Sequence, residues 1–178
     1  MTKHYCYTDT PLGKILLAGD FQGLSLINFQ DGPAPVLPEK HWRKDAAYFV
    51  QAIIQLQEYF AGKRQRFSLR LNPSGTEFQL KVLEVVARIP YGETASYADI
   101  ARIVGKPKAV RAVGAANRTN PLPIVVPCHR VVGSNGRLTG FNGGLEAKQW
   151  LLELEGLNCQ GGEDGDEQWV ETAEVEMA

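Results

Sequence analysis

A break in the pattern of the chain at residues 72–75, which read Asn-Pro-Ser-Gly, limits what this sequence can fold into. Proline lacks a backbone N–H and glycine favours turns, so neither a helix nor a strand is expected to run through this stretch. Strand-like alternation is prominent before the break, and helical patterns dominate after it. We therefore predict an α+β protein with one domain and its linker over residues 1–75, a second domain over 76–156, and a tail over 157–178.

The first domain is predicted to be a small α/β unit that begins with a β-hairpin. Two apolar runs, at residues 14–18 and 24–29, flank glycine-containing turn residues, and this pattern is typical of paired strands. Residues 67–71, Phe-Ser-Leu-Arg-Leu, alternate apolar and polar side chains. That alternation predicts a further strand.

A helix is predicted between these strands, after a proline-rich loop. Asp45 is of the residue type that caps a helix N-terminus, and Gly62 stands where a C-terminal cap belongs. The side chains expected to face the core recur with helical spacing. They are Phe49, Ile53, Leu56 and Phe60.

Two capping boxes open helices in the second domain. Thr76 with Gln79, and Ser96 with Asp99, each place a hydroxyl at the N-cap and a polar partner three residues later. The first helix is expected to end by Pro90, and the second to run from about residue 97 to 104. The apolar side of the first helix comprises Phe78, Val82, Val85, Val86 and Ile89.

A third helix, from about residue 108 to 117, follows a turn that contains Gly105, so that the two short helices form a helix-turn-helix. Val110 and Val113 are expected to face inward. The remaining surface combines alanines with Lys and Arg side chains. One interpretation is a tightly packed helix with solvated charges, and the other is a recognition helix that lies close to DNA.

The net charge of −1 conceals an uneven distribution. Residues 1–156 carry 19 basic and 13 acidic side chains, whereas residues 157–178 carry seven acidic and no basic ones. A basic body suits a phosphate backbone, although such a charge also occurs without one. The acidic, glycine-rich tail is expected to be disordered or loosely attached. Because no apolar run approaches the roughly 18 residues of a membrane span and no secretory signal is evident, we expect a cytoplasmic protein without a membrane partner.

The cysteines of the chain predict neither a disulfide framework nor a metal site. Cys6, Cys128 and Cys159 are far apart, and no CxxC or Cys/His pair has the spacing of zinc ligands. At least one thiol should therefore be free.

Cys128 differs from the other cysteines in its surroundings. The preceding residues, 120–127, are largely apolar and contain three prolines, which would stiffen the backbone and place the thiol accurately. The thiolate is the reactive form of cysteine, and the adjacent His129 and Arg130 would favour it. These features indicate a nucleophile, with a buried structural cysteine as the alternative.

Residues 127–130, Pro-Cys-His-Arg, followed by Val-Val-Gly, resemble the active-site signature of the O6-alkylguanine-DNA alkyltransferases. The similarity extends over about residues 76–156 and is weaker in the first half. The further segments that match are 10–13, 56–62, 91–93, 96–97, 107–114, 120–121, 143–145 and 151–156.

The resemblance implies a ribonuclease H-like N-terminal domain followed by a winged helix-turn-helix-like domain that binds DNA and carries the active site. It implies DNA repair by direct reversal, in which the alkyl group of O6-alkylguanine, and also of O4-alkylthymine, passes irreversibly to Cys128. Each molecule would act once. The implied partner is double-stranded DNA with an alkylated guanine, bound through its minor groove by a monomer, without a cofactor or metal.

The resemblance also implies catalytic roles. Cys128 attacks the alkyl carbon, His129 acts through one water as a general base, and Glu155 accepts a hydrogen bond from the other imidazole nitrogen. Tyr97 presents its hydroxyl to the leaving guanine. The residues alone leave a partly buried core tyrosine as an alternative for Tyr97.

On the DNA side, the resemblance assigns Arg111 to the gap that a flipped-out nucleotide leaves in the base stack. Ala109 and Ala112 are small enough to let the backbone approach the minor groove. Asn120 ties the recognition helix to the active-site segment, and Arg118 is expected to join the DNA-binding set.

The substrate pocket is implied in the same way. The main-chain carbonyls of Cys128 and Val131 accept hydrogen bonds from the guanine amine, and Phe141 stands where relatives carry an aromatic wall of the alkyl pocket. Asn142 and Gly143 complete the predicted pocket.

Three other functions fit the residues less well. A non-enzymatic lesion sensor of the same fold would lack the acceptor cysteine, which this chain retains. A helix-turn-helix regulator would need a base-reading helix with fewer alanines. A cysteine hydrolase would need an orienting Asn or Asp and a glycine-rich oxyanion element, and neither is placed for that chemistry.

Overall fold

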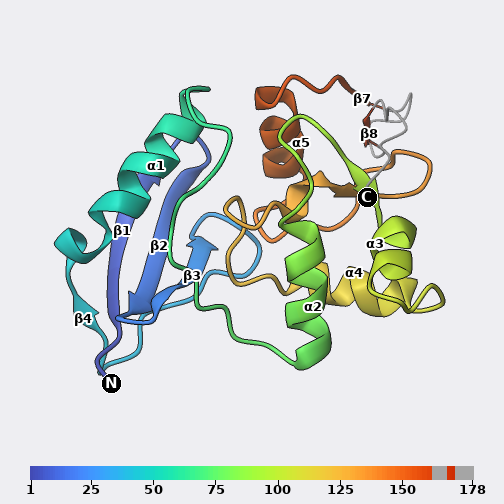
Figure 1. Ribbon diagram of the computed structural model, residues 1–178. Coiled ribbons are helices and arrows are strands. Elements are labelled where there is room, and N and C mark those ends of the chain that lie inside the picture. The colour runs from blue at the N-terminus through green and yellow to red at the C-terminus, as the bar shows by residue number, and fades with distance from the viewer. Residues whose placement is uncertain (162–167, 171–178) are drawn as a thin grey trace.

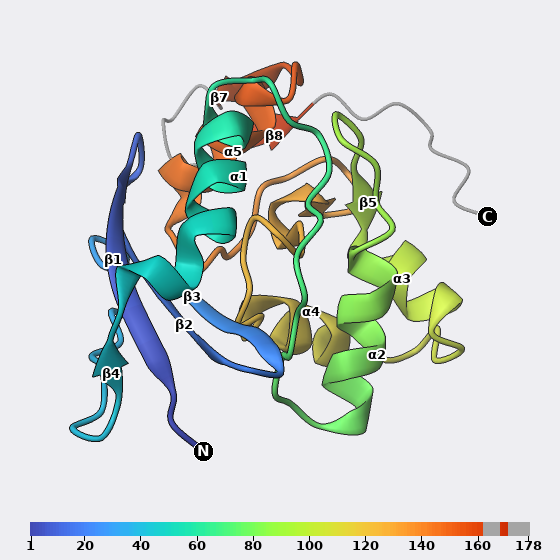
Figure 2. The same ribbon diagram turned by 60° about the vertical axis from the view of Figure 1, so that its left-hand side comes forward.

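The computed structural model describes residues 1–161 and 168–170. Figure 1 shows a sheet with a helix against it at the N-terminal end and a helical part at the other, and Figure 2 shows the same two parts after a rotation. No helix in these described ranges is long and apolar enough to cross a membrane.

The N-terminal sheet has the strand order β3-β2-β1-β4. It comprises β1 (His4–Thr10), β2 (Gly13–Asp20), β3 (Gly23–Phe29) and β4 (Arg43–Lys44), of which only β4 runs parallel to its neighbour. The predicted hairpin, β2 with β3, is confirmed. The central strand β2 is buried from Ile15 to Ala18, which explains its unbroken apolar run.

The predicted helix begins differently from the expectation. A 3-10 turn, η1 (Ala46–Phe49), precedes α1 (Val50–Phe60), and the side chain of Asp45 makes no capping hydrogen bond. That carboxylate lies 3.5 Å from Nδ1 of His4 instead. Gly62 has a φ of 71°, the left-handed conformation expected of a residue just beyond a helix.

The buried face of α1 is also rotated from the predicted one. Ile53 and Phe60 are only partly buried, whereas Tyr59 is completely enclosed. The side chains of this helical segment that are buried are Phe49, Ala52, Gln55, Leu56 and Tyr59.

The strand predicted over residues 67–71 does not form. Only a single bridge joins Leu71 to Leu24, because the side chain of Gln55 occupies the backbone groups of Ser68. Gln55 accepts from the Ser68 N–H at 2.8 Å and donates to its carbonyl at 3.1 Å. A side chain has thus replaced a strand partner, which no local pattern reveals.

In the helical part, both predicted capping boxes are confirmed. Thr76 caps α2 (Glu77–Val86) and Ser96 caps α3 (Tyr97–Ile103), each with reciprocal hydrogen bonds. The short strands β5 (Ala95–Ser96) and β6 (Val131–Val132) pair in parallel beside them.

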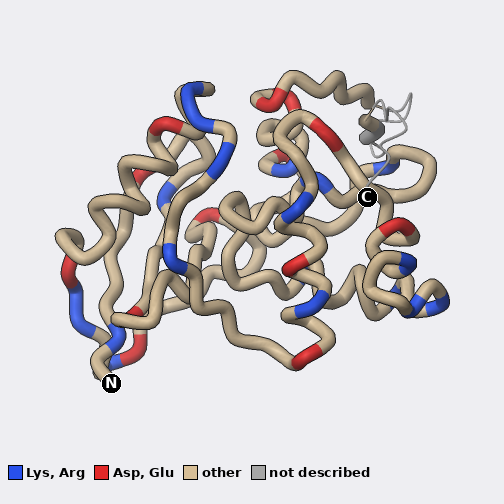
Figure 3. Tube along the Cα trace, viewed as in Figure 1, with Lys and Arg blue, Asp and Glu red and all other residues tan. Residues whose placement is uncertain are grey.

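The third helix, α4 (Val110–Arg118), begins two residues later than predicted. Val113 is fully buried, but Val110, which was expected to face inward, is 37% exposed at the first turn of the helix. Lys and Arg residues are concentrated along the chain at the turn between α3 and α4 (Figure 3). Exposed members of this cluster include Arg102, Lys106 and Lys108.

We expected the tail to be disordered or loosely attached, and the part of it that the structure describes forms two short strands. After α5 (Leu145–Leu154), strands β7 (Cys159–Gly161) and β8 (Gln168–Val170) pair as an antiparallel hairpin. Val170 packs with Val132, Leu138 and Leu152, and its N–H donates to the carbonyl of Gly136 at 2.9 Å. The rest of the predicted disorder, over 162–167 and 171–178, lies outside the described residues.

Candidate active site

The segment that leads to Cys128 is fixed by hydrogen bonds as well as by prolines. Asn120 donates to the carbonyl of Val126 at 2.9 Å and accepts from the N–H of Leu122 at 2.9 Å. Within this clamp, Ile124 is held at a φ of 74°, a conformation that a β-branched residue adopts only when its surroundings enforce it. The cysteine is therefore placed by a rigid loop.

Cys128 begins the 3-10 turn η2 (Cys128–Arg130) and is 3% exposed. Burial raises the pKa of its thiol to about 11, although hydrogen bonding by Asn120 and the charge of Lys148 oppose the rise. The expectation that Arg130 activates this thiol is wrong, because its guanidinium is directed to Glu155. The resting residue is a neutral thiol.

Lys148 is a residue of the site that the sequence analysis did not identify. Its side chain on α5 is fully buried, and Nζ donates to the carbonyls of Val131 and Thr139 at 2.6 and 2.8 Å. Burial lowers the pKa of this lysine to about 8, opposed by the charge that Cys128 can carry. The sequence feature that could have indicated Lys148 is its position within the apolar stripe of a helix, between Ala147 and Leu151.

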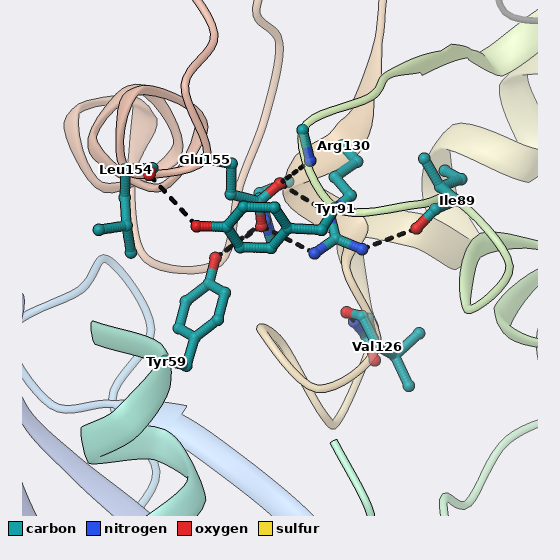
Figure 4. A network of polar contacts seen from close by, with 10 residues as sticks. Tyr59, Ile89, Tyr91, Val126, Arg130, Leu154 and Glu155 are labelled. Atoms are coloured by element: carbon teal, nitrogen blue, oxygen red, sulfur yellow. Dashed lines mark hydrogen bonds and ion pairs between the residues drawn. The ribbon is translucent and has the colours of Figure 1, made fainter. Parts of the chain in front are cut away.

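Arg130 contacts the carboxylate of Glu155, the residue that follows α5 (Figure 4). His129 contacts the same carboxylate. His129 Nε2 lies 2.8 Å from Oε1, and Arg130 donates through Nε to Oε2 at 2.9 Å and through a terminal nitrogen to Oε1 at 2.8 Å. The N–H of Gly92 donates to Oε2 at 3.1 Å and the hydroxyl of Tyr59 to Oε1 at 2.7 Å. Five donors thus surround one buried carboxylate.

These contacts determine the charge states of Glu155 and His129. Burial alone would raise the pKa of Glu155, but the hydrogen bonds and charges of His129 and Arg130 outweigh it and hold that pKa well below its usual value. Burial lowers the pKa of His129, against the pull of Glu155. An ionised carboxylate only accepts, so His129 carries its proton on Nε2. Its Nδ1 is buried without a hydrogen-bond partner among the described residues, which leaves that nitrogen as the basic one.

A hollow of about 510 Å³ lies between α4 and the loop before Phe141. Tyr97 and Thr139 both line it, and the Thr139 hydroxyl donates to that of Tyr97 at 3.0 Å. Burial raises the pKa of Tyr97, so its hydroxyl keeps its proton. The residues that line the hollow are Tyr97, Val110, Arg111, Gly114, Arg118, Thr139 and Gly140.

The residues predicted to bind DNA fall into two groups. Arg111, Ala112 and Arg118 are exposed on α4, and Ala109 at its start is half-buried. Asn120 is 2% exposed, so it holds the loop rather than presenting a group to a partner. The link from α4 to Cys128 is made by Asn117, which the sequence analysis missed and which donates to the carbonyl of Cys128 at 3.2 Å.

The predicted pocket residues lie around His129 and the N-terminal sheet. Phe141 is buried, with its ring 6.4 Å from the imidazole of His129 and edge-on to Phe29 at 5.6 Å. A Cβ added at Gly143 would come within 2.9 Å of Phe141 and 3.1 Å of Phe29, so only glycine fits there. Asn142 is half-buried, and Val131 is buried with its carbonyl held by Lys148.

Two family models match the chain. Residues 3–73 match the ribonuclease-like domain of 6-O-methylguanine DNA methyltransferase, and residues 77–157 match the DNA-binding domain of the same protein.

Several relatives are similar over nearly their whole length. A methylated-DNA–protein-cysteine methyltransferase of Methanosarcina acetivorans is 48% identical over 153 residues, which cover 86% of this chain and 98% of the relative. A constitutive enzyme of that name from Bacillus subtilis is 47% identical, covering 87% and 96%. The crystal structure of Mycobacterium tuberculosis OGT in complex with DNA superposes with a TM-score of 0.80 at 45% identity, covering 85% of this chain and 92% of that one.

Proposed function

The chain belongs to the 6-O-methylguanine DNA methyltransferase family, and from that premise we propose that Cys128 is the acceptor of the alkyl group. The protein is a DNA-binding methyltransferase that repairs DNA by alkyl transfer to one of its cysteines. The observation that supports Cys128 is its place at the start of η2, directly before a histidine whose Nε2 is hydrogen-bonded to an ionised glutamate. Cys6 and Cys159 have no such neighbour in the described residues.

In the proposed reaction, Sγ of Cys128 forms a bond to the alkyl carbon while the bond between that carbon and O6 of guanine breaks. The electron pair leaves with the guanine, and the thiol proton passes through one water to Nδ1 of His129. Tyr97 supplies a proton to the departing base, which solvent then restores. Lys148, whose positive charge favours the ionised form of Cys128, stabilises the thiolate as it forms.

We further propose that the base reaches this centre by leaving the duplex. Arg111 and Arg118 line the hollow and are exposed on α4, so a helix laid against the minor groove would bring both to the DNA. Arg111 would take the place of the flipped nucleotide in the stack. Ala112, exposed on the same helix, leaves room for the backbone to approach.

The product of this reaction is a thioether, which has no leaving group under these conditions, so each molecule should act once. We propose O6-alkylguanine as the main lesion and O4-alkylthymine as a second, with the protein acting as a cytoplasmic monomer without a cofactor. No three Cys, His, Asp or Glu side chains gather as metal ligands in the described ranges.

Mass spectrometry tests the proposal directly. The purified chain is mixed with a duplex oligonucleotide that carries one O6-methylguanine, and the intact protein and its peptides are weighed. We expect a gain of one methyl group, on the peptide that contains Cys128, saturating at one per protein. Cys128→Ala should bind the duplex and gain no methyl group, while Cys159→Ala serves as the matched control and should react as the native chain does.

Other outcomes would contradict specific parts of the proposal. Repair of several equivalents of lesion per protein would contradict the single use of each molecule. Methylation of a cysteine other than Cys128 would show that Cys128 is not the acceptor. Binding of the lesion without any methyl transfer would favour a sensor of the same fold.

A further inference from the structure

Tyr59 connects the N-terminal part of the molecule to the chemistry of the C-terminal part. It lies near the end of α1, is completely buried, and points its hydroxyl at the Glu155 carboxylate (Figure 4). The hydroxyl is 2.7 Å from Oε1 of Glu155 and 3.4 Å from Nε2 of His129. Among the described residues, it is the one side chain from before residue 76 that reaches this carboxylate.

The hydroxyl acts as a donor here. Burial, together with the adjacent Glu155 charge, raises the pKa of Tyr59 far above its usual value, so the phenol stays protonated. Because the carboxylate only accepts, the proton of Tyr59 points to Oε1. The same oxygen also accepts from His129 and from Arg130.

Three donors on one oxygen share its negative charge. Each further hydrogen bond to a carboxylate makes that carboxylate less basic, and a less basic partner holds the imidazole proton less strongly. Tyr59 therefore weakens the pull of Glu155 on His129. A base that is held less strongly by its orienting carboxylate stays neutral, and so remains able to accept a proton, at a lower pH.

We propose that Tyr59 is a positioning residue through which the N-terminal part holds Glu155 against His129 and keeps the histidine unprotonated. The inference rests on the proposed function in taking His129 as the base that receives the thiol proton. It adds that the first half of the chain, besides supporting the fold, takes part in setting the proton affinity of that base.

The other groups that face His129 belong to the second half of the chain. They are Glu155 and Lys148 from α5, and Cys128 and Arg130 from η2 itself. The ring of Tyr59 is held independently of its hydroxyl, because it packs edge-on or tilted against Phe60, Phe67 and Tyr91. Removal of the hydroxyl should therefore leave the ring and the fold in place.

The test compares two phenylalanine variants of the full chain. Tyr59→Phe removes the hydroxyl from the carboxylate. Tyr91→Phe is the matched control, because its hydroxyl is nearby but donates to the carbonyl of Leu154 at 3.3 Å. The protonation midpoint of His129 is measured by NMR titration of its imidazole nitrogens, and the transfer rate to a methylated duplex is measured against pH in single-turnover reactions.

In Tyr59→Phe we expect the His129 midpoint and the acid limb of the rate profile to move together to higher pH, by on the order of half a unit to one unit. Tyr91→Phe should leave both unchanged. Incorporation of 3-fluorotyrosine at position 59, which keeps the ring and makes the phenol a stronger donor, should move both in the opposite direction. This second variant tests the inference even if Tyr59→Phe folds poorly.

An unchanged or lowered midpoint in Tyr59→Phe, or an equal shift in Tyr91→Phe, would overturn the inference. A loss of thermal stability in Tyr59→Phe without a shift of the midpoint would also overturn it, because it would reduce Tyr59 to a packing residue. The NMR titration needs no DNA, so it distinguishes this failure from a failure of the proposed function, in which no methyl group reaches Cys128.

Discussion

Cys128 and His129 are adjacent in the chain, yet each is kept neutral by its own surroundings. The pKa of the thiol is raised to about 11, and that of the histidine is lowered from its ordinary value of 6.5, in both cases chiefly by burial. The resting pair is thus a thiol beside an unprotonated base. In the proposed mechanism, transfer requires the histidine in its neutral form.

The pH dependence of transfer follows from that state. Because the pKa of His129 is lowered, we expect the single-turnover rate to fall with decreasing pH along a curve whose midpoint lies below 6.5. The measurement is the methyl-transfer rate between about pH 4.5 and 8, limited to the range in which circular dichroism shows a folded protein. A decline centred at or above pH 6.5 would contradict the assigned charge state.

Lys148 offers a second prediction for a single residue. Lys148→Met keeps most of the volume of the side chain but removes the donor to Val131 and Thr139 and the positive charge that favours ionised Cys128. We expect the transfer rate to fall by about 100-fold, as when a preorganised donor is removed from an active site. Lys40→Met, at an exposed position, is the control. Equal rates in both variants would show that the buried cation has no part in transfer.

Sequence reasoning found the residues that a short motif holds together and missed those that meet only in three dimensions. Cys128 and His129 belong to one motif, and Glu155 was carried over from the resemblance. Tyr59 and Lys148 were missed because each looks like one more member of a helix face, and its partner comes from a distant segment. The polar groups of both side chains form hydrogen bonds with residues far away in the sequence, and no local pattern predicts such bonds.

At the scale of elements, α4 is the part that we expect to meet DNA. Arg111 is exposed on this helix and lines the hollow, so Arg111→Ala should weaken repair of a methylated duplex far more than reaction with free O6-benzylguanine, which needs no base flipping. Rates on the two substrates, measured by mass spectrometry of the modified protein, check this. Equal losses of rate on the two substrates would show that Arg111 has no part in the proposed flipping step.

The hairpin of β7 and β8 gives a prediction about stability. Val170 is 4% exposed and packs on Val132, Leu138 and Leu152, so Val170→Ala removes buried hydrocarbon from this cluster. We expect the free energy of unfolding to fall by about 2 kcal/mol, measured by urea denaturation. Val36→Ala, at an exposed site, is the control. Identical midpoints for the two variants would mean that the hairpin contributes nothing to stability.

At this scale, features that depend on nearby residues were predicted correctly, and a feature that depends on a contact with a distant residue was not. The capping boxes at Thr76 and Ser96 depend on groups three residues apart, so sequence alone identified them. The strand over residues 67–71 failed because Gln55, more than ten residues earlier, takes the backbone groups of Ser68. Strand β1 was not predicted at all, since most of its side chains are only half-buried and none of them is aliphatic.

Across the whole molecule, the Glu155 carboxylate joins the two halves of the chain. Tyr59 reaches it from α1, while His129 and Arg130 reach it from η2. A backbone hydrogen bond from Ile27 to the carbonyl of Pro121, 2.8 Å long, also crosses between the halves. Sequence patterns indicated the two halves but could not indicate these contacts, because each one depends on how the halves pack.

Glu155→Gln should therefore destabilise the molecule as a whole. The change leaves the buried guanidinium of Arg130 without its counter-charge, which costs about 3 kcal/mol or more in the free energy of unfolding. Arg102→Gln, which breaks an exposed ion pair with Asp99, is the control and should cost well under 1 kcal/mol. Chemical denaturation at neutral pH gives both values, and equal losses would contradict the role of the buried carboxylate.

The same carboxylate predicts how stability depends on pH. The pKa of Glu155 is lower in the folded protein than its ordinary value of 4.5, so the unfolded chain takes up the proton first as the pH falls. Its contribution is fully present well above pH 4.5 and is lost progressively below it. Unfolding measured between about pH 6 and 3 should thus show a smaller loss of stability in Glu155→Gln than in the native chain. Equal losses of stability in the two proteins would mean that groups other than Glu155 cause the acid sensitivity.

The burial of Cys128 also bears on which alkylating agents can consume the protein. An ordinary cysteine, with a pKa of 9.0, is about 100 times more ionised at neutral pH than one with a pKa of about 11, and the thiolate is the form that electrophiles attack. A cysteine that is 3% exposed and neutral is thus shielded from the small reactive compounds that damage DNA in the first place. If Cys128 is the acceptor and is used once, as proposed, it is then not consumed by soluble electrophiles and remains available for the lesion that enters the site.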